Sequence, residues 1–154
     1  MQRLAALGLA MFAVLALATG AVGARPPGKP PRVSGVTVAP PPAWVETGGR
    51  ARWLTFGSYC WYTACVDMLP PASRPDLPVL RLPAEGSVRI HLAFRPSSLS
   101  VRILTGAKLG PLVKLPARAV VDWHADRAGV AVIEARGHRG SASYLLRLTP
   151  RSVA

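Results

Sequence analysis

Alternation of apolar and polar residues is the clearest pattern in the second half of the chain. Between Val88 and Arg95 every second residue is apolar, and most of the alternate positions carry arginine or histidine. Successive side chains of a strand point to opposite faces, so a period of two predicts a half-buried strand. The same period occurs in Leu99–Ile103 and in Ser143–Leu148. In the last of these, the residues expected to face the core are Tyr144, Leu146 and Leu148.

Further short apolar runs are separated by proline, glycine and other turn residues. They predict strands in Trp53–Tyr62, Val79–Leu82, Ala119–Trp123 and Gly129–Ala135. Sixteen prolines and fourteen glycines work against long helices. About six to eight short strands at spacings of about ten residues predict an all-β domain. An immunoglobulin-like β-sandwich is the leading prediction, and a small β-barrel is the alternative.

The N-terminus has a different pattern, which is typical of an export signal. Arg3 gives a positive start, Leu4–Ala18 carries no charge, and the small residues Val22 and Ala24 follow at a spacing of two. This order predicts a helical signal peptide over residues 1–24 with cleavage after Ala24. The apolar run is shorter than the roughly 20 residues that span a bilayer. An uncleaved N-terminal anchor is the alternative.

A proline-rich segment separates the predicted signal from the predicted domain. Seven prolines fall between Arg25 and Pro42, a composition that favours an extended linker. The alternation in Val33–Val38 also fits a first strand, and an ordered segment lying along the domain is the alternative to a free linker. The expected organisation is a signal (1–24), a linker (25–43), a β-sandwich domain (44–150) and a tail (151–154).

The two cysteines change the picture of the region around residue 60. An even cysteine count in an exported chain predicts a disulfide between Cys60 and Cys65, closing a tight hairpin or loop. A redox pair, or a copper site with Met68 as a further ligand, is the alternative, but the spacing is not that of a C-x-x-C motif.

Aromatic residues concentrate beside the cysteines, and they form either a recognition patch or part of the core. On a strand, Tyr59 and Trp61 share one side while Cys60 and Tyr62 share the other, so at least one aromatic ring is expected on the surface. The candidate binding residues in this cluster are Tyr59, Trp61 and Tyr62.

The net charge of the chain indicates which class of partner it attracts. The chain has 19 Lys and Arg against 7 Asp and Glu, a net charge of +12. Such a protein is attracted to anionic cell-wall polymers, anionic lipid surfaces or nucleic acid, and export makes nucleic acid unlikely. The alternative is that the arginine content reflects a GC-rich genome. Candidate surface arginines are Arg89, Arg95 and Arg102, and a basic face is expected if their strands share a sheet with those of Arg81, Arg136 and Arg147.

Candidate chemistry beyond these features is weak. Asp122, His124 and Asp126 would share one face of a strand and could hold a divalent cation. However, the sequence from Asp126 to Gly129 is typical of a turn, which favours a solvated face. There is no nucleophile-elbow pattern and no clear Ser-His-Asp arrangement. The sequence therefore predicts no catalytic residue, no metal site, no cofactor and no enzyme activity.

The motif Gly57-Ser58-Tyr59-Cys60-Trp61, followed by Cys65-Val66-Asp67, resembles a motif in small exported bacterial β-sandwich proteins of unknown function. The general layout matches from Trp53 to Leu148, but only the cysteine motif is specific. The resemblance implies an envelope location and an immunoglobulin-like sandwich, and it carries no activity. Many members of that group are lipid-anchored, whereas this chain lacks the anchoring cysteine.

These observations predict an exported, envelope-associated domain. Its expected partner is an anionic cell-wall polymer, a lipid surface or an envelope protein. A metal-handling or enzyme-accessory protein is the alternative.

Overall fold

The structure, a computed structural model, describes residues 25–32, 38–82 and 86–150 of the chain. The predicted signal segment, residues 33–37 of the expected first strand and the tail 151–154 lie outside the described residues. Within the described part, no helix has the length and apolar character needed to cross a membrane.

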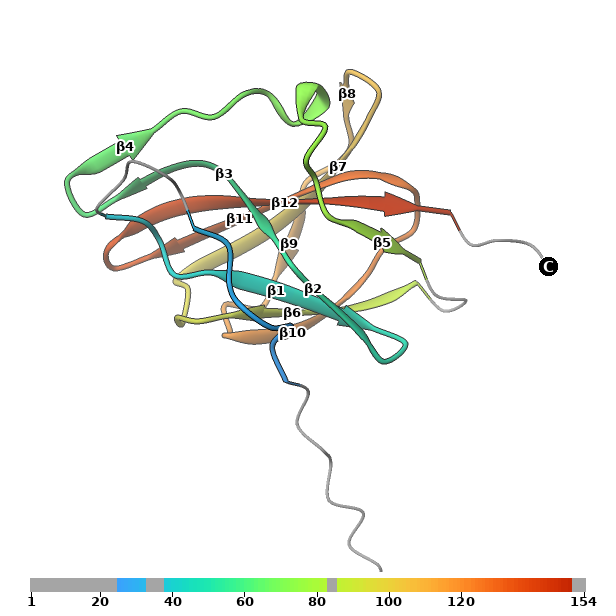
Figure 1. The fold of residues 1–154 in the computed structure, drawn as a ribbon, viewed down its shortest axis with the longest axis horizontal. Coiled ribbons are helices and arrows are strands. Elements are labelled where there is room, and N and C mark those ends of the chain that lie inside the picture. The colour runs from blue at the N-terminus through green and yellow to red at the C-terminus, as the bar shows by residue number, and fades with distance from the viewer. Residues whose placement is uncertain (1–24, 33–37, 83–85, 151–154) are drawn as a thin grey trace, which may run out of the picture.

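Twelve strands and one short 3-10 helix make up the described chain (Figure 1). They are β1 (Ala43–Thr47), β2 (Arg50–Trp53), β3 (Thr55–Trp61), β4 (Ala64–Val66), η1 (Pro71–Ser73), β5 (Val79–Arg81), β6 (Ser87–Leu92), β7 (Ser98–Thr105), β8 (Lys108–Leu109), β9 (Val113–Leu115), β10 (Val120–His124), β11 (Gly129–Gly137) and β12 (Gly140–Thr149).

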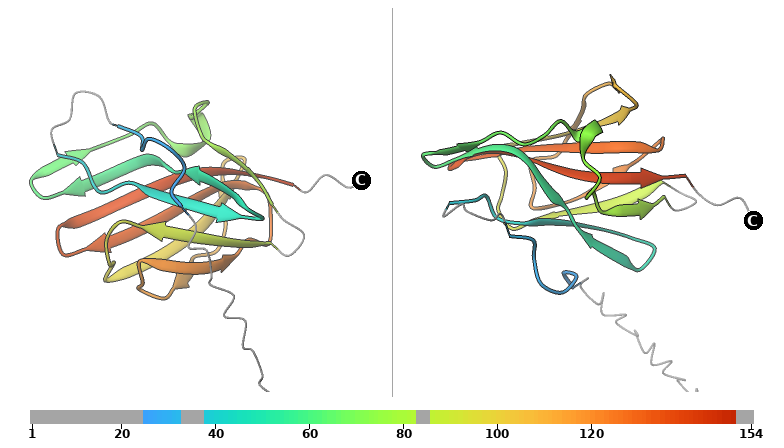
Figure 2. Two further views of the ribbon diagram at one scale, coloured as in Figure 1. Left: turned by 60° about the horizontal axis from the view of Figure 1, so that its bottom comes forward. Right: turned by 45° about the horizontal axis from the view of Figure 1, so that its top comes forward.

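The strands form two sheets. The small sheet has the order β10-β6-β1-β2. The large sheet has the order β4-β3-β12-β11-β7-β8, with β9 also paired to β7 and β5 running parallel to β12. The right-hand view of Figure 2 separates the two sheets, which pack face to face. The all-β prediction is confirmed, in the form of a two-sheet sandwich.

The core lies between the sheets and follows the predicted alternation. Val88 and Ile90 of β6 are fully buried from the small sheet, and Tyr144 and Leu146 of β12 are fully buried from the large sheet. Trp123 also faces the core, at 5% exposure. Each such side chain stabilises the fold by about 1.5–3 kcal/mol relative to an exposed position.

A second apolar cluster lies on the outer side of the large sheet, beneath the segment that connects β4 to β5. Its members are Leu77, Leu104, Val130 and Leu145. The connecting segment is fixed by Arg74, which is 8% exposed. The Arg74 guanidinium donates hydrogen bonds to both carboxylate oxygens of Asp76, at 2.8 and 2.7 Å, and to the Phe56 carbonyl at 3.3 Å. The outer face of the large sheet is therefore covered at one end only.

The proline-rich segment is partly integrated into the domain. Val38 and Ala39 pack against the core, and the Tyr144 hydroxyl donates a hydrogen bond to the Pro41 carbonyl at 2.8 Å. Burial raises the pKa of Tyr144 well above its usual value. Residues 25–32 cross β1 in Figure 1 and lie on the side of the small sheet away from the large sheet in Figure 2. The contacts with the domain are thus made by residues 38–42, whereas most of residues 25–32 are exposed.

Candidate functional site

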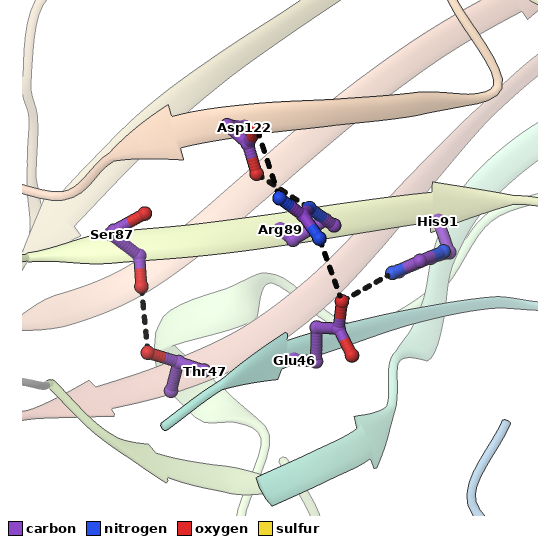
Figure 3. Close-up of polar contacts among 6 residues, drawn as sticks. All are labelled: Glu46, Thr47, Ser87, Arg89, His91 and Asp122. Carbon is purple, nitrogen blue, oxygen red and sulfur yellow. Dashed lines mark hydrogen bonds and ion pairs between the residues drawn. The ribbon is translucent and has the colours of Figure 1, made fainter. Parts of the chain in front are cut away.

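The outer face of the small sheet carries a closed network of charges centred on Arg89 (Figure 3). Strand pairing places Arg89 opposite Glu46 of β1 and opposite Asp122 of β10. Arg89 Nε donates to Asp122 Oδ1 at 2.7 Å, and Arg89 Nη1 lies 3.6 Å from Glu46 Oε1. The hydrogen bond from Arg89 lowers the pKa of Asp122. One guanidinium is thus shared by two carboxylates.

His91 and Trp44 complete this face. His91 Nε2 lies 3.2 Å from Glu46 Oε1, and the imidazole stacks on the Trp44 ring with 3.6 Å between centroids. Thr47 Oγ1 donates to the Ser87 carbonyl at 2.6 Å, which ties β1 to β6 (Figure 3). Because Arg89 already has two carboxylate partners, it is not a free cation for an anionic ligand. Arg89 therefore does not belong to the basic face that the sequence predicted.

The three residues considered for a metal site do not come together. β10 ends at His124, and Asp126 lies beyond it in a loop, paired with Arg127 at 2.6 Å, as the turn-like sequence predicts. Asp122 is held by Arg89. In the described ranges, no group of three His, Cys, Asp or Glu side chains is placed to hold a metal ion.

The aromatic cluster is divided between core and surface. Tyr59 and Trp61 are each 3% exposed and face the core, where Trp61 meets Phe94 edge-on at 5.1 Å between ring centroids. Expecting these two side chains on a binding surface was wrong, because they fill the space between the sheets. Tyr62 is 58% exposed in the β3–β4 turn, with the Arg139 guanidinium carbon 5.0 Å from its ring centroid.

The predicted disulfide is present. Cys60 of β3 and Cys65 of β4 are directly opposed in the antiparallel hairpin and are bonded to each other. Both are exposed on the outer side of the large sheet. The bond closes the hairpin at the β4 edge of the large sheet.

Beside the disulfide hairpin, the uncovered part of the large sheet holds a polar hollow of about 410 Å³. Glu134 of β11 is opposite Ser143 on one side and Ser100 on the other, and Arg136 is opposite Ser141 and Ser98. Five of the ten serines in the chain line this hollow, which we call the serine hollow. Its lining residues are Ser58, Ser98, Ser100, Glu134, Ala135, Arg136, Ser141, Ala142 and Ser143.

Two of these serines have fixed hydrogen-bond roles. Ser58 Oγ accepts a hydrogen bond from the Met68 N–H at 3.1 Å, which leaves its hydroxyl proton free to donate. Ser143 Oγ donates to the Ser58 carbonyl at 2.8 Å, which leaves its lone pairs free to accept. Within the described chain, the hydroxyls of Ser98, Ser100 and Ser141 have no hydrogen-bond partner. The hollow therefore presents both donors and acceptors to a ligand.

Cations lie beside the serine hollow and farther along the same face of the large sheet. Lys114 of β9 is opposite Ser100, and Arg102 of β7 is opposite Val132, next to Glu134 along β11. Arg81 and Arg147 lie farther along the same sheet, on paired strands. None of these residues forms an ion pair with another described residue. We call this surface the basic face: Arg81, Arg102, Lys114, Arg136 and Arg147.

One end of the basic face is extended by loops. The Ser97 N–H donates to the Arg136 carbonyl at 2.6 Å, which places the loop carrying Arg95 next to β11. Arg139 lies in the β11–β12 turn beside Tyr62. Of the six arginines expected to share a face, four share the large sheet, Arg95 is in the adjoining loop, and Arg89 is on the other sheet.

The serine hollow was not predicted from the sequence, although a signal was present. Ser98 and Ser100 repeat at a spacing of two, as do Ser141 and Ser143, and each pair lies in a strand. Such spacing places both hydroxyls on one face. What the sequence could not give is that β11, with Glu134 and Arg136, runs between the two strands.

Comparisons with protein-family models, with curated proteins and with solved structures give no match to this chain. The resemblance of the Gly57–Trp61 motif to small exported proteins therefore stays a prediction.

Proposed function

We propose that this chain is a non-enzymatic, exported, envelope-associated domain that binds an anionic polymer of the cell envelope on its basic face. The observation that supports this most is the unequal distribution of charge between the sheets. Strands of the large sheet carry six Lys and Arg and a single acid, Glu134, whereas strands of the small sheet carry three Arg and two acids.

The chemistry of the basic face suits a polyanion. Arginine guanidinium groups bind carboxylate or phosphate through two parallel hydrogen bonds, and this geometry is available only to arginines that have no acidic partner. Arg102 and Arg136 meet that condition among the described residues. An extended anionic chain can contact several such groups at once.

The predicted location outside the cytoplasm supports the same proposal. The N-terminal pattern is that of an export signal, and the Cys60–Cys65 disulfide is typical of proteins outside the reducing cytoplasm. Anionic polymers of the envelope are then the polyanions most accessible to the protein.

The test compares two double variants that remove the same charge from different sheets. Arg102→Gln with Arg136→Gln removes two cations from the basic face, and Arg50→Gln with Arg52→Gln removes two from β2 of the small sheet. Binding to isolated envelope material is measured by co-sedimentation from about 50 mM to about 500 mM salt, a range over which screening becomes strong.

We expect the Arg102/Arg136 variant to bind at least about tenfold more weakly, from the loss of two charge-assisted contacts. The Arg50/Arg52 variant should bind almost as wild type does. Equal losses in the two variants would show that net charge alone governs binding. Binding by the wild type that survives high salt would contradict the proposal.

A further inference from the structure

Glu134 is out of place on a surface that only attracts polyanions. It is exposed, it lies in the serine hollow, and it is the only acid in the strands of the large sheet. A carboxylate there repels phosphate or carboxylate ligands. A hydroxyl-bearing ligand, in contrast, can donate hydrogen bonds to it, and hydrogen bonds to a charged acceptor are stronger than neutral ones.

The position of Arg136 supplies a complementary charge. Arg136 follows Glu134 by two residues on the same strand, so both side chains leave the same face with about 7 Å between their positions along the strand. One sugar ring spans such a separation. Its carboxylate can pair with the Arg136 guanidinium while its hydroxyls donate to Glu134.

The serines give the hollow its shape and its remaining hydrogen-bonding groups. They lie on β3, β12 and β7, and β11 runs between β12 and β7, so hydroxyls flank Glu134 and Arg136 on both sides. Because serine side chains are short, they leave a depression beside longer neighbours. A hollow of about 410 Å³ falls within the size range of small-molecule sites.

From this geometry we infer that the serine hollow binds a carboxylated sugar unit of an anionic polysaccharide. Arg136 pairs with the carboxylate, Glu134 accepts from ring hydroxyls, and the serines complete the hydrogen bonds. This inference rests on the proposed function and names the ligand class for the same face. It distinguishes the hollow from the surrounding cations, which attract any polyanion.

The test uses the full-length protein and three polymers. Polygalacturonate has carboxylates and hydroxyls, polyphosphate has charge without sugar hydroxyls, and dextran has hydroxyls without charge. Affinities are measured at low salt for wild type, Glu134→Gln, and the control Glu46→Gln, which removes one negative charge from the small sheet.

The inference predicts opposite responses in Glu134→Gln. Polygalacturonate should bind about fivefold more weakly, because the charged acceptor for the hydroxyls is lost. Polyphosphate should bind at least about twofold more tightly, because a repulsive charge is lost. In Glu46→Gln both affinities should shift slightly in one direction. Removing hydroxyls in Ser98→Ala with Ser141→Ala should weaken polygalacturonate alone.

Other outcomes separate this inference from the proposed function. If Glu134→Gln tightens both charged polymers, Glu134 is only a repulsive charge, the sugar site is wrong, and the basic face stands. If dextran binds as tightly as polygalacturonate, the role given to Arg136 is wrong. If the wild type binds neither charged polymer, the proposed function fails as well.

Discussion

The outer faces of the two sheets differ in whether their arginines are paired with acidic side chains. On the small sheet, Arg89 lies between Glu46 and Asp122, and the charges of that network are satisfied within the protein (Figure 3). On the large sheet, Arg102 and Arg136 have no acidic partner among the described residues. Exposed ion pairs contribute little to stability, so the main effect of the Arg89 network is to remove charge from its surface.

This difference shows why a count of arginines does not locate a basic surface. Arg89 and Arg102 occur in similar alternating contexts, Val-Arg-Ile in both strands. What separates them is the neighbouring strand. β6 runs between β1 and β10, which supply carboxylates opposite Arg89, whereas Arg102 on β7 lies opposite Val132 of β11.

The largest expected effect comes from the shared core, where the two sheets should be alike. Ile90 of the small sheet and Ile133 of the large sheet are both fully buried. Ile90→Ala and Ile133→Ala should each lower the free energy of unfolding by about 2–5 kcal/mol, through lost burial and the cavity left behind. Urea denaturation with a single transition checks this. A cost below about 1 kcal/mol for either variant would show that its sheet lies outside the cooperative core.

The sequence predicted this core better than it predicted the surfaces. The alternation in β6, β7 and β12 identified both the strands and their inward faces, because burial on one side imposes a period of two. The strands β1, β2, β4, β8 and β9 were not identified. β8 and β9 are short and exposed, and four of the five residues of β1 are buried, so none of these three strands shows that period.

Which residues gather on each face depends on how the strands pair, and a single sequence does not reveal that pairing. Alternation correctly separated Tyr62 from Tyr59 and Trp61, but it could not say which group faced the core. Likewise, the serine hollow requires β11 to lie between β7 and β12, and the Arg89 network requires β6 to lie between β1 and β10. Contacts of this kind join residues that are far apart in the sequence.

Two ion-paired arginines, one on each side of the molecule, should also differ in how much they stabilise the fold, by less than the core residues do. Arg74 on the large-sheet side is almost fully buried and also holds the Phe56 carbonyl, whereas Arg89 is half exposed. Arg74→Ala should lower the free energy of unfolding by about 1–3 kcal/mol, because it leaves a buried acceptor unsatisfied. Arg89→Ala should have a clearly smaller effect. Guanidinium denaturation of both variants measures the difference, and equal costs would contradict it.

Arg89→Ala also tests the electrostatic comparison directly. It leaves Glu46 and Asp122 without their cation, so the strands of the small sheet then carry two Arg against two acids while the basic face is unchanged. Affinity for an envelope polyanion should therefore fall by less than about twofold. A loss of affinity as large as that in the Arg102/Arg136 variant would show that Arg89 contacts the polyanion.

The smallest expected effect is on the pH dependence of stability. Hydrogen bonds from Arg89 and Arg74 hold the pKa values of Asp122 and Asp76 below the usual 3.8. A carboxyl whose pKa is lower in the folded state contributes stability above its unfolded pKa, and that contribution is lost as pH falls through the folded pKa. The thermal midpoint should therefore be level from pH 7 to about pH 5 and fall below about pH 4.

The aspartates of the two faces should differ in how much of this acid effect they carry. Asp76 holds a buried guanidinium, so Asp76→Asn should flatten the decline below about pH 4 more than Asp122→Asn does. Thermal melts of both variants at pH 6 and pH 2.5 give the comparison. If Asp122→Asn flattened the decline more, the exposed network on the small sheet would contribute more to stability than the buried Arg74 contact, which would reverse the contrast between the faces.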